Sequence, residues 1–204
     1  FYESLDELIY MVFDQLMDRF KIIAKKQVLN YPFLMGQGVW IDSERLNPED
    51  TIEDVIKNGT MSVGFIGLAE CLVALIGKHH GESKEAFDLG YQILKHMRDI
   101  CDKHTVDTGL NFSLFSTPAE GLSGRFVKID KKLYGIIPGV TDREYYTNSF
   151  HVPVYYEISA AEKIRIEGPF HELCNAGSIS YIEMDGDLTK NIEAFEKVIL
   201  YMKE

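Results

Sequence analysis

The stretch from Thr117 to Arg125, Thr-Pro-Ala-Glu-Gly-Leu-Ser-Gly-Arg, combines residue types that can bind an anion. It follows an apolar, β-prone run and precedes a helical pattern, so we expect it where a strand turns into a helix. The first turn of a helix has unpartnered N–H groups and a partial positive charge. Glycines allow close approach to the backbone, and arginine adds a forked cation. The predicted phosphate-binding loop consists of Thr117, Pro118, Ala119, Glu120, Gly121, Ser123 and Arg125.

The same residues also suit an ordinary helix start. Thr117 fits the N-cap, Pro118 the first helical position, and Glu120 the third, which completes a capping box. A carboxylate at Glu120 would also repel phosphate, unless it bonds back to the N–H of Thr117. From the residues alone, a plain cap and an anion site both stay open.

Two other segments place polar side chains beside turn residues. Tyr-Thr-Asn-Ser-Phe-His contains Asn148, Ser149 and His151, and Cys-Asn-Ala-Gly contains Asn175. Asparagine and serine in turns commonly bond their own backbone, which is the structural alternative. The functional hypothesis is that these four side chains converge on a substrate pocket.

The cysteines give little support for a metal or disulfide site. Their number is odd and they lie far apart: Cys71, Cys101 and Cys174. Cys101 and His104 have i, i+3 spacing but no third ligand, so we interpret Cys101 as a core residue. The sequence therefore predicts no metal ligand, no disulfide framework and a reducing compartment.

Composition sets further bounds on the function. The 204 residues are 46% hydrophobic and 26% charged, with a formal net charge of −11. That charge disfavours nonspecific binding to nucleic acid, which needs a basic surface. No apolar run is long enough to predict a membrane span, and the first residues lack a signal-peptide pattern. Since the sequence does not begin with methionine, we expect a piece of a longer cytoplasmic protein.

The first half of the chain shows helical, then mixed patterns. A capping box at Ser4 predicts a long helix that ends near Asn30, and a short acidic helix follows Pro48. An apolar run then predicts a strand over residues 61–66, with Gly64 and Gly67 packed closely in the corner that follows. The next helix is expected to end at Gly81, with His79 and His80 at its negative end.

In the second half of the chain, helical and strand patterns alternate. We expect a helix over residues 86–101, a strand over 110–116, extended chain over 145–156, and a short helix from Ala160 to Ile166. Ser178–Met184 reads as a strand. A last helix is predicted to direct its apolar residues inward: Ile192, Phe195, Ile199 and Met202. Strands alternating with helices predict parallel pairing and an α/β fold without a domain linker.

Four stretches together resemble the class III, oxygen-sensitive anaerobic ribonucleoside-triphosphate reductases. They are Asn58–Glu70, Leu114–Phe126, Gly139–Tyr156 and Asn175–Gly186, in that order along the chain. The resemblance implies that residues 1–204 are a single fragment of the catalytic domain, the second half of a ten-stranded α/β barrel. It also implies that the Thr117–Arg125 loop cradles the substrate phosphates.

For the complete enzyme, the resemblance implies reduction of ribonucleoside triphosphates to 2′-deoxyribonucleoside triphosphates. The radical is passed from a glycyl radical to a thiyl radical, and formate is the usual reductant. A radical S-adenosylmethionine activating enzyme, a homodimer, a zinc module and ATP or dATP as allosteric effectors are further implications. The sequence contains no Met-Gly-Cys segment, cysteine quartet or glycyl loop, so we expect no catalytic residue here and no turnover by the fragment. The alternatives are a pyruvate formate-lyase-like glycyl radical enzyme and a non-catalytic phosphate-binding α/β module.

Overall fold

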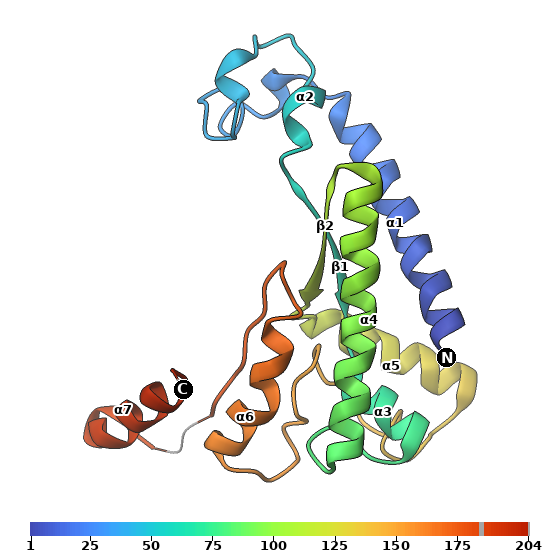
Figure 1. Ribbon diagram of the computed structural model, residues 1–204, viewed down its shortest axis with the longest axis vertical. Helices are drawn as coiled ribbons and strands as arrows, with labels where there is room; N and C mark the ends of the chain where they lie inside the picture. Colours follow the sequence, from blue (N-terminus) through green and yellow to red (C-terminus); the bar gives the residue numbers. More distant parts are fainter. Residues whose placement is uncertain (184–185, 204) are drawn as a thin grey trace. The chain divides into compact units, whose positions relative to one another are not determined.

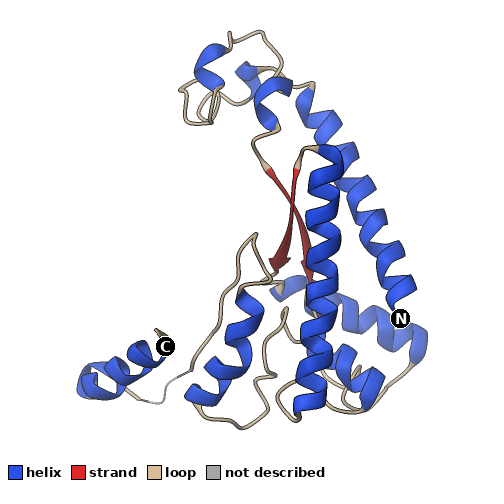
Figure 2. Cartoon of the chain, viewed as in Figure 1, coloured by secondary structure: helices blue, strands red, loops and turns tan. Residues whose placement is uncertain are grey.

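The structure, a computed structural model, describes residues 1–183 and 186–203 (Figure 1). Helices predominate over strands in this part of the chain (Figure 2). In chain order the elements are α1 (Tyr2–Ala24), the 3-10 helices η1 (Val28–Asn30) and η2 (Ser43–Arg45), α2 (Glu53–Ile56), β1 (Thr60–Phe65), α3 (Leu68–Ile76), α4 (Lys84–Thr108), β2 (Asn111–Ser116), α5 (Glu120–Tyr134), α6 (Ala160–His171), η3 (Leu188–Lys190) and α7 (Ile192–Tyr201).

The two strands are hydrogen-bonded neighbours and run parallel. A parallel pair needs a long crossover connection, and α3 and α4 form it here. The predicted α/β class with parallel strands and intervening helices is therefore confirmed.

The chain divides into two compact units, which are described separately. The first comprises residues 1–63 and 97–113. In it, buried Phe13 of α1 stacks on the ring of His104, with 4.1 Å between centroids, and meets Phe112 edge-on at 5.0 Å. A second cluster under the glycine-rich connection contains Val28, Met35, Ile52 and Val55.

The second unit comprises residues 64–96 and the chain from residue 114 onward. Its core is aromatic, because Phe150 stacks on Phe170 of α6 with 5.6 Å between ring centroids. Aliphatic side chains from α3, α4, β2 and α5 complete this core: Leu72, Leu94, Leu114 and Val127. All the candidate site residues lie in this unit.

Several helix boundaries differ from the prediction. Helix α1 begins at Tyr2, so Ser4 lies inside it and caps nothing, and the helix ends at Ala24 before the separate turn η1. Helix α3 ends at Ile76, because Gly77 adopts a left-handed conformation (φ 79°) and its N–H bonds the carbonyl of Val73. The prediction that this helix reaches Gly81 was wrong.

The strand predicted over Ser178–Met184 does not form in the described residues, and the extended chain predicted over residues 145–156 is less regular than expected. Residues 145–156 are broken by turns, apart from an isolated antiparallel bridge between Ile66 and Asn148. Residues 178–183 form no strand, and Met184, at the end of the predicted strand, lies outside the described residues. In this segment the hydroxyls of Ser178 and Ser180 bond side chains of α6.

The last helix does not bury its apolar face within the described structure. The side chains predicted to point inward are all exposed: Ile192, Phe195, Ile199 and Met202. Helix α6 is longer than the predicted helix from Ala160 to Ile166, because it continues through Pro169 to His171. Its N-cap is Ser159, whose side chain accepts the N–H of Glu162. Among the described residues, no helix has both the length and the apolar character needed to cross a membrane.

Candidate functional site

The carboxyl ends of β1 and β2 are held together by a close contact. A Cβ atom at Gly64, in β1, would lie 2.0 Å from Oγ1 of Thr117, directly after β2. Only glycine fits at that distance. The close packing expected at Gly64 is therefore found, but its partner is the loop after β2 and not a helix. Gly67 has φ 77° at the N-cap of α3, where a left-handed backbone favours glycine.

The start of α5 differs from the predicted capping box. The helix begins at Glu120 with Ala119 at the N-cap, and no side chain caps it. Thr117 instead directs its hydroxyl to the carbonyl of Phe115 at 3.4 Å. The helix therefore starts two residues later than the cap prediction required, at Glu120 and not at Pro118.

This uncapped start leaves the groups that an anion needs. No side chain caps the first-turn N–H groups of α5, and a Cβ at Gly121 would meet nothing within 4 Å. Arg125 is exposed, one helical turn beyond Gly121, and no described carboxylate pairs with it. Ser123 is buried, and its hydroxyl donates to the carbonyl of Glu120 at 3.1 Å. The loop residues that face solvent are therefore Pro118, Glu120, Gly121 and Arg125.

A cavity of about 450 Å³ lies in the second unit, and residues 117–125 are not among those that line it. The link between the two is Tyr146 in the cavity wall, whose N–H donates to the carbonyl of Ser123 at 3.4 Å. The segment 143–156, the start of α6 and residues 181–183 line the cavity. Its cationic or ionisable nitrogen groups belong to Arg143, His151 and Lys163, and the Arg143 guanidinium lies 3.4 Å from the ring centroid of Tyr155. The tyrosines in its wall are Tyr145, Tyr146, Tyr155, Tyr156 and Tyr181.

The four predicted pocket residues have different positions. Asn148 and His151 line the cavity, and Oδ1 of Asn148 is buried without a hydrogen-bond partner among the described residues. Ser149 is buried with φ 44°, and its carbonyl accepts from the N–H of Leu68 at 3.2 Å. Asn175 lies outside the lining residues and accepts the N–H of Leu114 at 3.0 Å, which ties it to β2.

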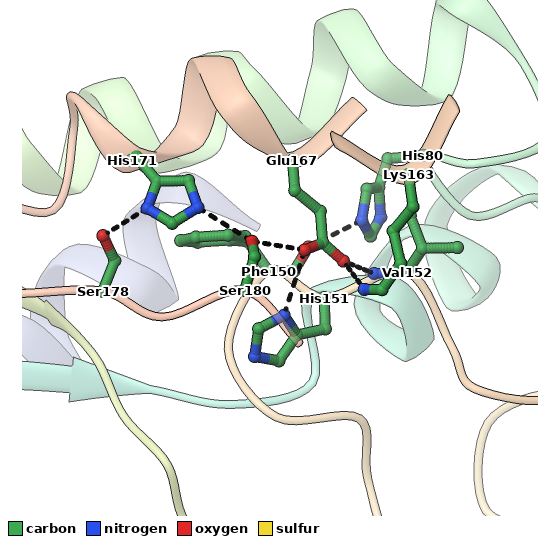
Figure 3. A network of polar contacts seen from close by, with 9 residues as sticks. All are labelled: His80, Phe150, His151, Val152, Lys163, Glu167, His171, Ser178 and Ser180. Carbon is green, nitrogen blue, oxygen red and sulfur yellow. Dashed lines mark hydrogen bonds and ion pairs between the residues drawn. The ribbon is translucent and has the colours of Figure 1, made fainter. Parts of the chain in front are cut away.

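Glu167 is the centre of the polar network behind this cavity (Figure 3). Its side chain is fully buried and accepts hydrogen bonds from the N–H of Val152 at 2.9 Å and from Lys163. Its other oxygen accepts from the hydroxyl of Ser180 at 2.5 Å and lies 3.4 Å from Nδ1 of His151. Two cavity-lining side chains, His151 and Lys163, are thus held by one buried carboxylate.

The Glu167 carboxylate is charged despite its burial. Burial alone would raise its pKa, but the hydrogen bonds from His151, Lys163 and Ser180 outweigh that effect and lower the pKa to about 2. Sequence reasoning missed this residue. The available signal was the i, i+4 spacing of Lys163 and Glu167 on one helix, a common and therefore weak pattern.

Two further histidines adjoin the network. His171 bonds Ser178 through Nδ1 at 2.7 Å and Ser180 through Nε2 at 2.8 Å, and burial lowers its pKa. His80 bonds the carbonyl of Phe150 at 2.8 Å, and burial, followed by the neighbouring His79, lowers its pKa to about 4. Neither His79 nor His80 ends a helix, so the predicted dipole role for this pair was wrong.

Glu70 joins α3 to the cavity wall. One carboxyl oxygen accepts from the N–H of Thr147 at 2.9 Å and from its hydroxyl at 2.7 Å, while Oε2 is buried with no partner among the described residues. Burial raises the pKa of Glu70, although the bonds from Thr147 oppose the shift. This contact fixes the backbone just before Asn148.

The cysteines lie in unreactive surroundings. Burial raises the pKa of Cys71 to about 11 and that of Cys101 to about 12, so both thiols stay protonated. Cys174 is buried in the turn after α6. Within residues 1–183 and 186–203, no group of three or more His, Cys, Asp or Glu side chains could hold a metal ion.

Comparison with protein families finds one matching description over the whole chain. The family described as "Anaerobic ribonucleoside-triphosphate reductase" matches residues 1–204. Curated relatives with that name include one from Escherichia coli K12, 36% identical over 201 residues, and one from Enterobacteria phage T4, 38% identical over 200 residues. Each alignment covers 97% of this chain but only 28% and 31% of the respective relatives.

Solved structures with a similar fold carry related descriptions. A structure described as "Anaerobic ribonucleotide reductase" gives a TM-score of 0.62 at 19% identity, and covers 93% of this chain and 30% of its own. The Thermotoga maritima anaerobic ribonucleotide reductase with MES in the active site gives 0.61 at 19% identity, with 93% and 32% covered. At these identities the likeness shows a shared fold. This chain spans about a third or less of the length of these relatives and solved structures.

Proposed function

The chain belongs to the anaerobic ribonucleoside-triphosphate reductase family, and we propose that it supplies the phosphate-binding loop and part of the substrate pocket of such an enzyme. The complete enzyme would convert ribonucleoside triphosphates to 2′-deoxyribonucleoside triphosphates by radical chemistry, with formate as the usual reductant. Membership in this family removes the reason for a pyruvate formate-lyase-like assignment.

The observation that carries this proposal is the uncapped start of α5. Thr117 and Glu120 do not form the capping box that would have occupied these N–H groups, so the plain-cap alternative loses its main support. An uncapped helix N-terminus that follows the carboxyl end of a parallel strand is a common phosphate site in α/β proteins. Arg125, one turn along the same face as Gly121, adds the cation.

The division of labour within the site follows from its chemistry. The first-turn N–H groups of α5 and Arg125 would bind phosphate oxygens. The Glu120 carboxylate does not bond back to the N–H of Thr117, so its charge opposes an anion here, and this exposed side chain would have to turn away into solvent. Asn148 and His151, at the cavity wall, would contact the less charged part of the nucleotide. The buried Ser123, Ser149 and Asn175 would act by holding the backbone in place.

The remaining parts of the enzyme are further proposals. The parallel pair β1–β2 would form part of the second half of a ten-stranded barrel. The thiyl cysteine, the glycyl radical, the zinc module and the ATP or dATP site would belong to other segments of a cytoplasmic homodimer, which a radical S-adenosylmethionine enzyme activates. Residues 1–204 alone would then bind substrate poorly and not turn it over.

Arg125→Ala in the full-length reductase tests the loop. A charge-assisted hydrogen bond contributes about 1.5–3 kcal/mol, so we expect triphosphate affinity to fall by about tenfold or more while thermal stability is unchanged. Lys132→Ala is the matched control, because Lys132 is an exposed cation in the last turn of α5. If the Arg125 variant binds nucleotide normally but melts earlier, Arg125 is structural and the loop does not bind phosphate.

A further inference from the structure

The polar groups around Glu167 are all donors. The backbone N–H of Val152 and the ammonium of Lys163 bond Oε1, and neither of these groups can accept a hydrogen bond. The hydroxyl of Ser180 donates to Oε2, which also lies 3.4 Å from Nδ1 of His151. A charged carboxylate only accepts, so Nδ1 of His151 must carry the hydrogen in this contact.

That assignment determines the other nitrogen of the His151 ring. In a neutral imidazole ring with hydrogen on Nδ1, the Nε2 atom is a bare acceptor. The ring is one of the walls of the cavity, and Nε2 has no hydrogen-bond partner among the described residues. Figure 3 shows this second nitrogen turned away from Glu167.

The rest of the network has the same direction. Since Ser180 donates to Glu167, its oxygen accepts from Nε2–H of His171, and Nδ1 of His171 then accepts from the hydroxyl of Ser178. Glu167 therefore sets the direction of a chain of hydrogen bonds that reaches two histidines.

We propose that Glu167 is a positioning residue that fixes the tautomer of His151 and presents Nε2 to the cavity as a hydrogen-bond acceptor. This inference builds on the proposed function only in naming the ligand group, which would be a hydroxyl of the nucleotide's sugar. Glu167 itself does not line the cavity and acts through His151.

Glu167→Gln gives a specific expectation, because the amide has one accepting and one donating end. Its oxygen must face Val152 and Lys163, which can only donate. Its NH₂ group then faces His151 and Ser180, and Nδ1 of His151 must change from donor to acceptor. The hydrogen moves to Nε2, so the nitrogen that faces the cavity becomes a donor. The chain through Ser180 and His171 reverses as well.

Solid-state ¹⁵N NMR of histidine-labelled full-length protein, at about pH 8 where histidines are ordinarily neutral, reads these tautomers directly. We expect hydrogen on Nδ1 of His151 in the wild type and on Nε2 in Glu167→Gln, with the His151 signal identified by its loss in His151→Gln. Ser180→Ala is the matched control: it removes the link to His171 but leaves the His151–Glu167 contact, so the His151 tautomer should not change.

A second readout uses an electrophile. Diethylpyrocarbonate acylates a bare imidazole nitrogen, so mass spectrometry should find His151 acylated in the wild type and in Ser180→Ala, and at least about tenfold more slowly in Glu167→Gln. A wild-type His151 with hydrogen on Nε2 or on both nitrogens, or equal acylation in all three proteins, would overturn the proposal. Neither readout requires nucleotide, so a failure of the proposed function would appear separately, as a lack of protection by added triphosphate.

Discussion

Gly64→Ala should disturb the Thr117–Arg125 loop, the proposed phosphate site, through a single contact. The added Cβ would lie 2.0 Å from Oγ1 of Thr117, well inside van der Waals contact, and 3.3 Å from its Cβ. Alanine is intrinsically better than glycine in a strand by roughly 0.5–1 kcal/mol, so any loss of stability comes from the clash. Overpacking of this kind costs about 1–3 kcal/mol, and we expect a net destabilisation in that range.

The companion substitution Thr117→Ala separates this clash from other effects. It removes Oγ1, whose one hydrogen bond is long at 3.4 Å, and leaves only the 3.3 Å contact for the new methyl group. Alone it should cost under about 1 kcal/mol, and in Gly64→Ala/Thr117→Ala it should restore most of the lost stability, a coupling of about 1–2 kcal/mol. Gly121→Ala is the control in the same loop, because nothing lies within 4 Å of its Cβ position.

Hydrogen exchange in the full-length protein is the suitable assay, because it reports local opening free energies of β1 and of the start of α5. Gly64→Ala should raise exchange there, the double variant should return it close to the wild type, and Gly121→Ala should leave it unchanged or slower. Equal destabilisation in the single and double variants would refute the reasoning, since the contact with Thr117 would then not explain the need for glycine.

Two further predictions concern titratable side chains whose pKa is shifted by burial. The pKa of His80 is lowered to about 4 from an ordinary value near 6.5, so the unfolded chain binds a proton more readily than the folded one. The contribution of neutral His80 to the free energy of unfolding is therefore fully present above about pH 6.5. It falls by about 3 kcal/mol as the pH drops toward 4. Hydrogen exchange around Phe150 should show this loss. His80→Gln keeps a donor for the carbonyl of Phe150 but cannot titrate, so the pH dependence of exchange should become flat. An unchanged pH dependence in this variant would assign the effect to another group. Because burial raises the pKa of Cys71 and Cys101, iodoacetamide should label neither thiol in the native full-length protein but both after unfolding. The Cys71→Ser and Cys101→Ser variants should each retain turnover while losing about 1 kcal/mol of stability. Rapid native labelling or abolished turnover in a folded variant would contradict this.

The features predictable from sequence were those with local physical causes. The parallel strands, the glycine corner at Gly64 and Gly67 and the helix after the Thr-Pro-Ala-Glu stretch follow from periodicity and backbone freedom. The predicted helix cap did not form. Local rules at Thr117 and Pro118 both allow a cap, but the hydroxyl of Thr117 donates to the backbone carbonyl of Phe115 and caps no helical N–H group.

Long-range polar contacts were beyond sequence reasoning. Glu167 has the spacing of an ordinary exposed partner for Lys163, yet it is fully buried because donors from residues 151, 152 and 180 meet it. Ser178 and Ser180 looked strand-like, but their hydroxyls bond His171 and Glu167 and no strand forms there. Nothing in the local pattern distinguishes these outcomes, since each depends on a partner between 7 and 16 positions away in the chain.

The central claim is that the start of α5 binds substrate phosphates, and the most direct test is the affinity of the full-length reductase for a nucleoside and its mono-, di- and triphosphate. We predict that affinity rises with each phosphate, that the gain is largest for the triphosphate, and that Arg125→Ala removes much of this gain while Lys132→Ala does not. Affinity that is independent of phosphate number, or a phosphate gain that survives intact in Arg125→Ala, would contradict the account.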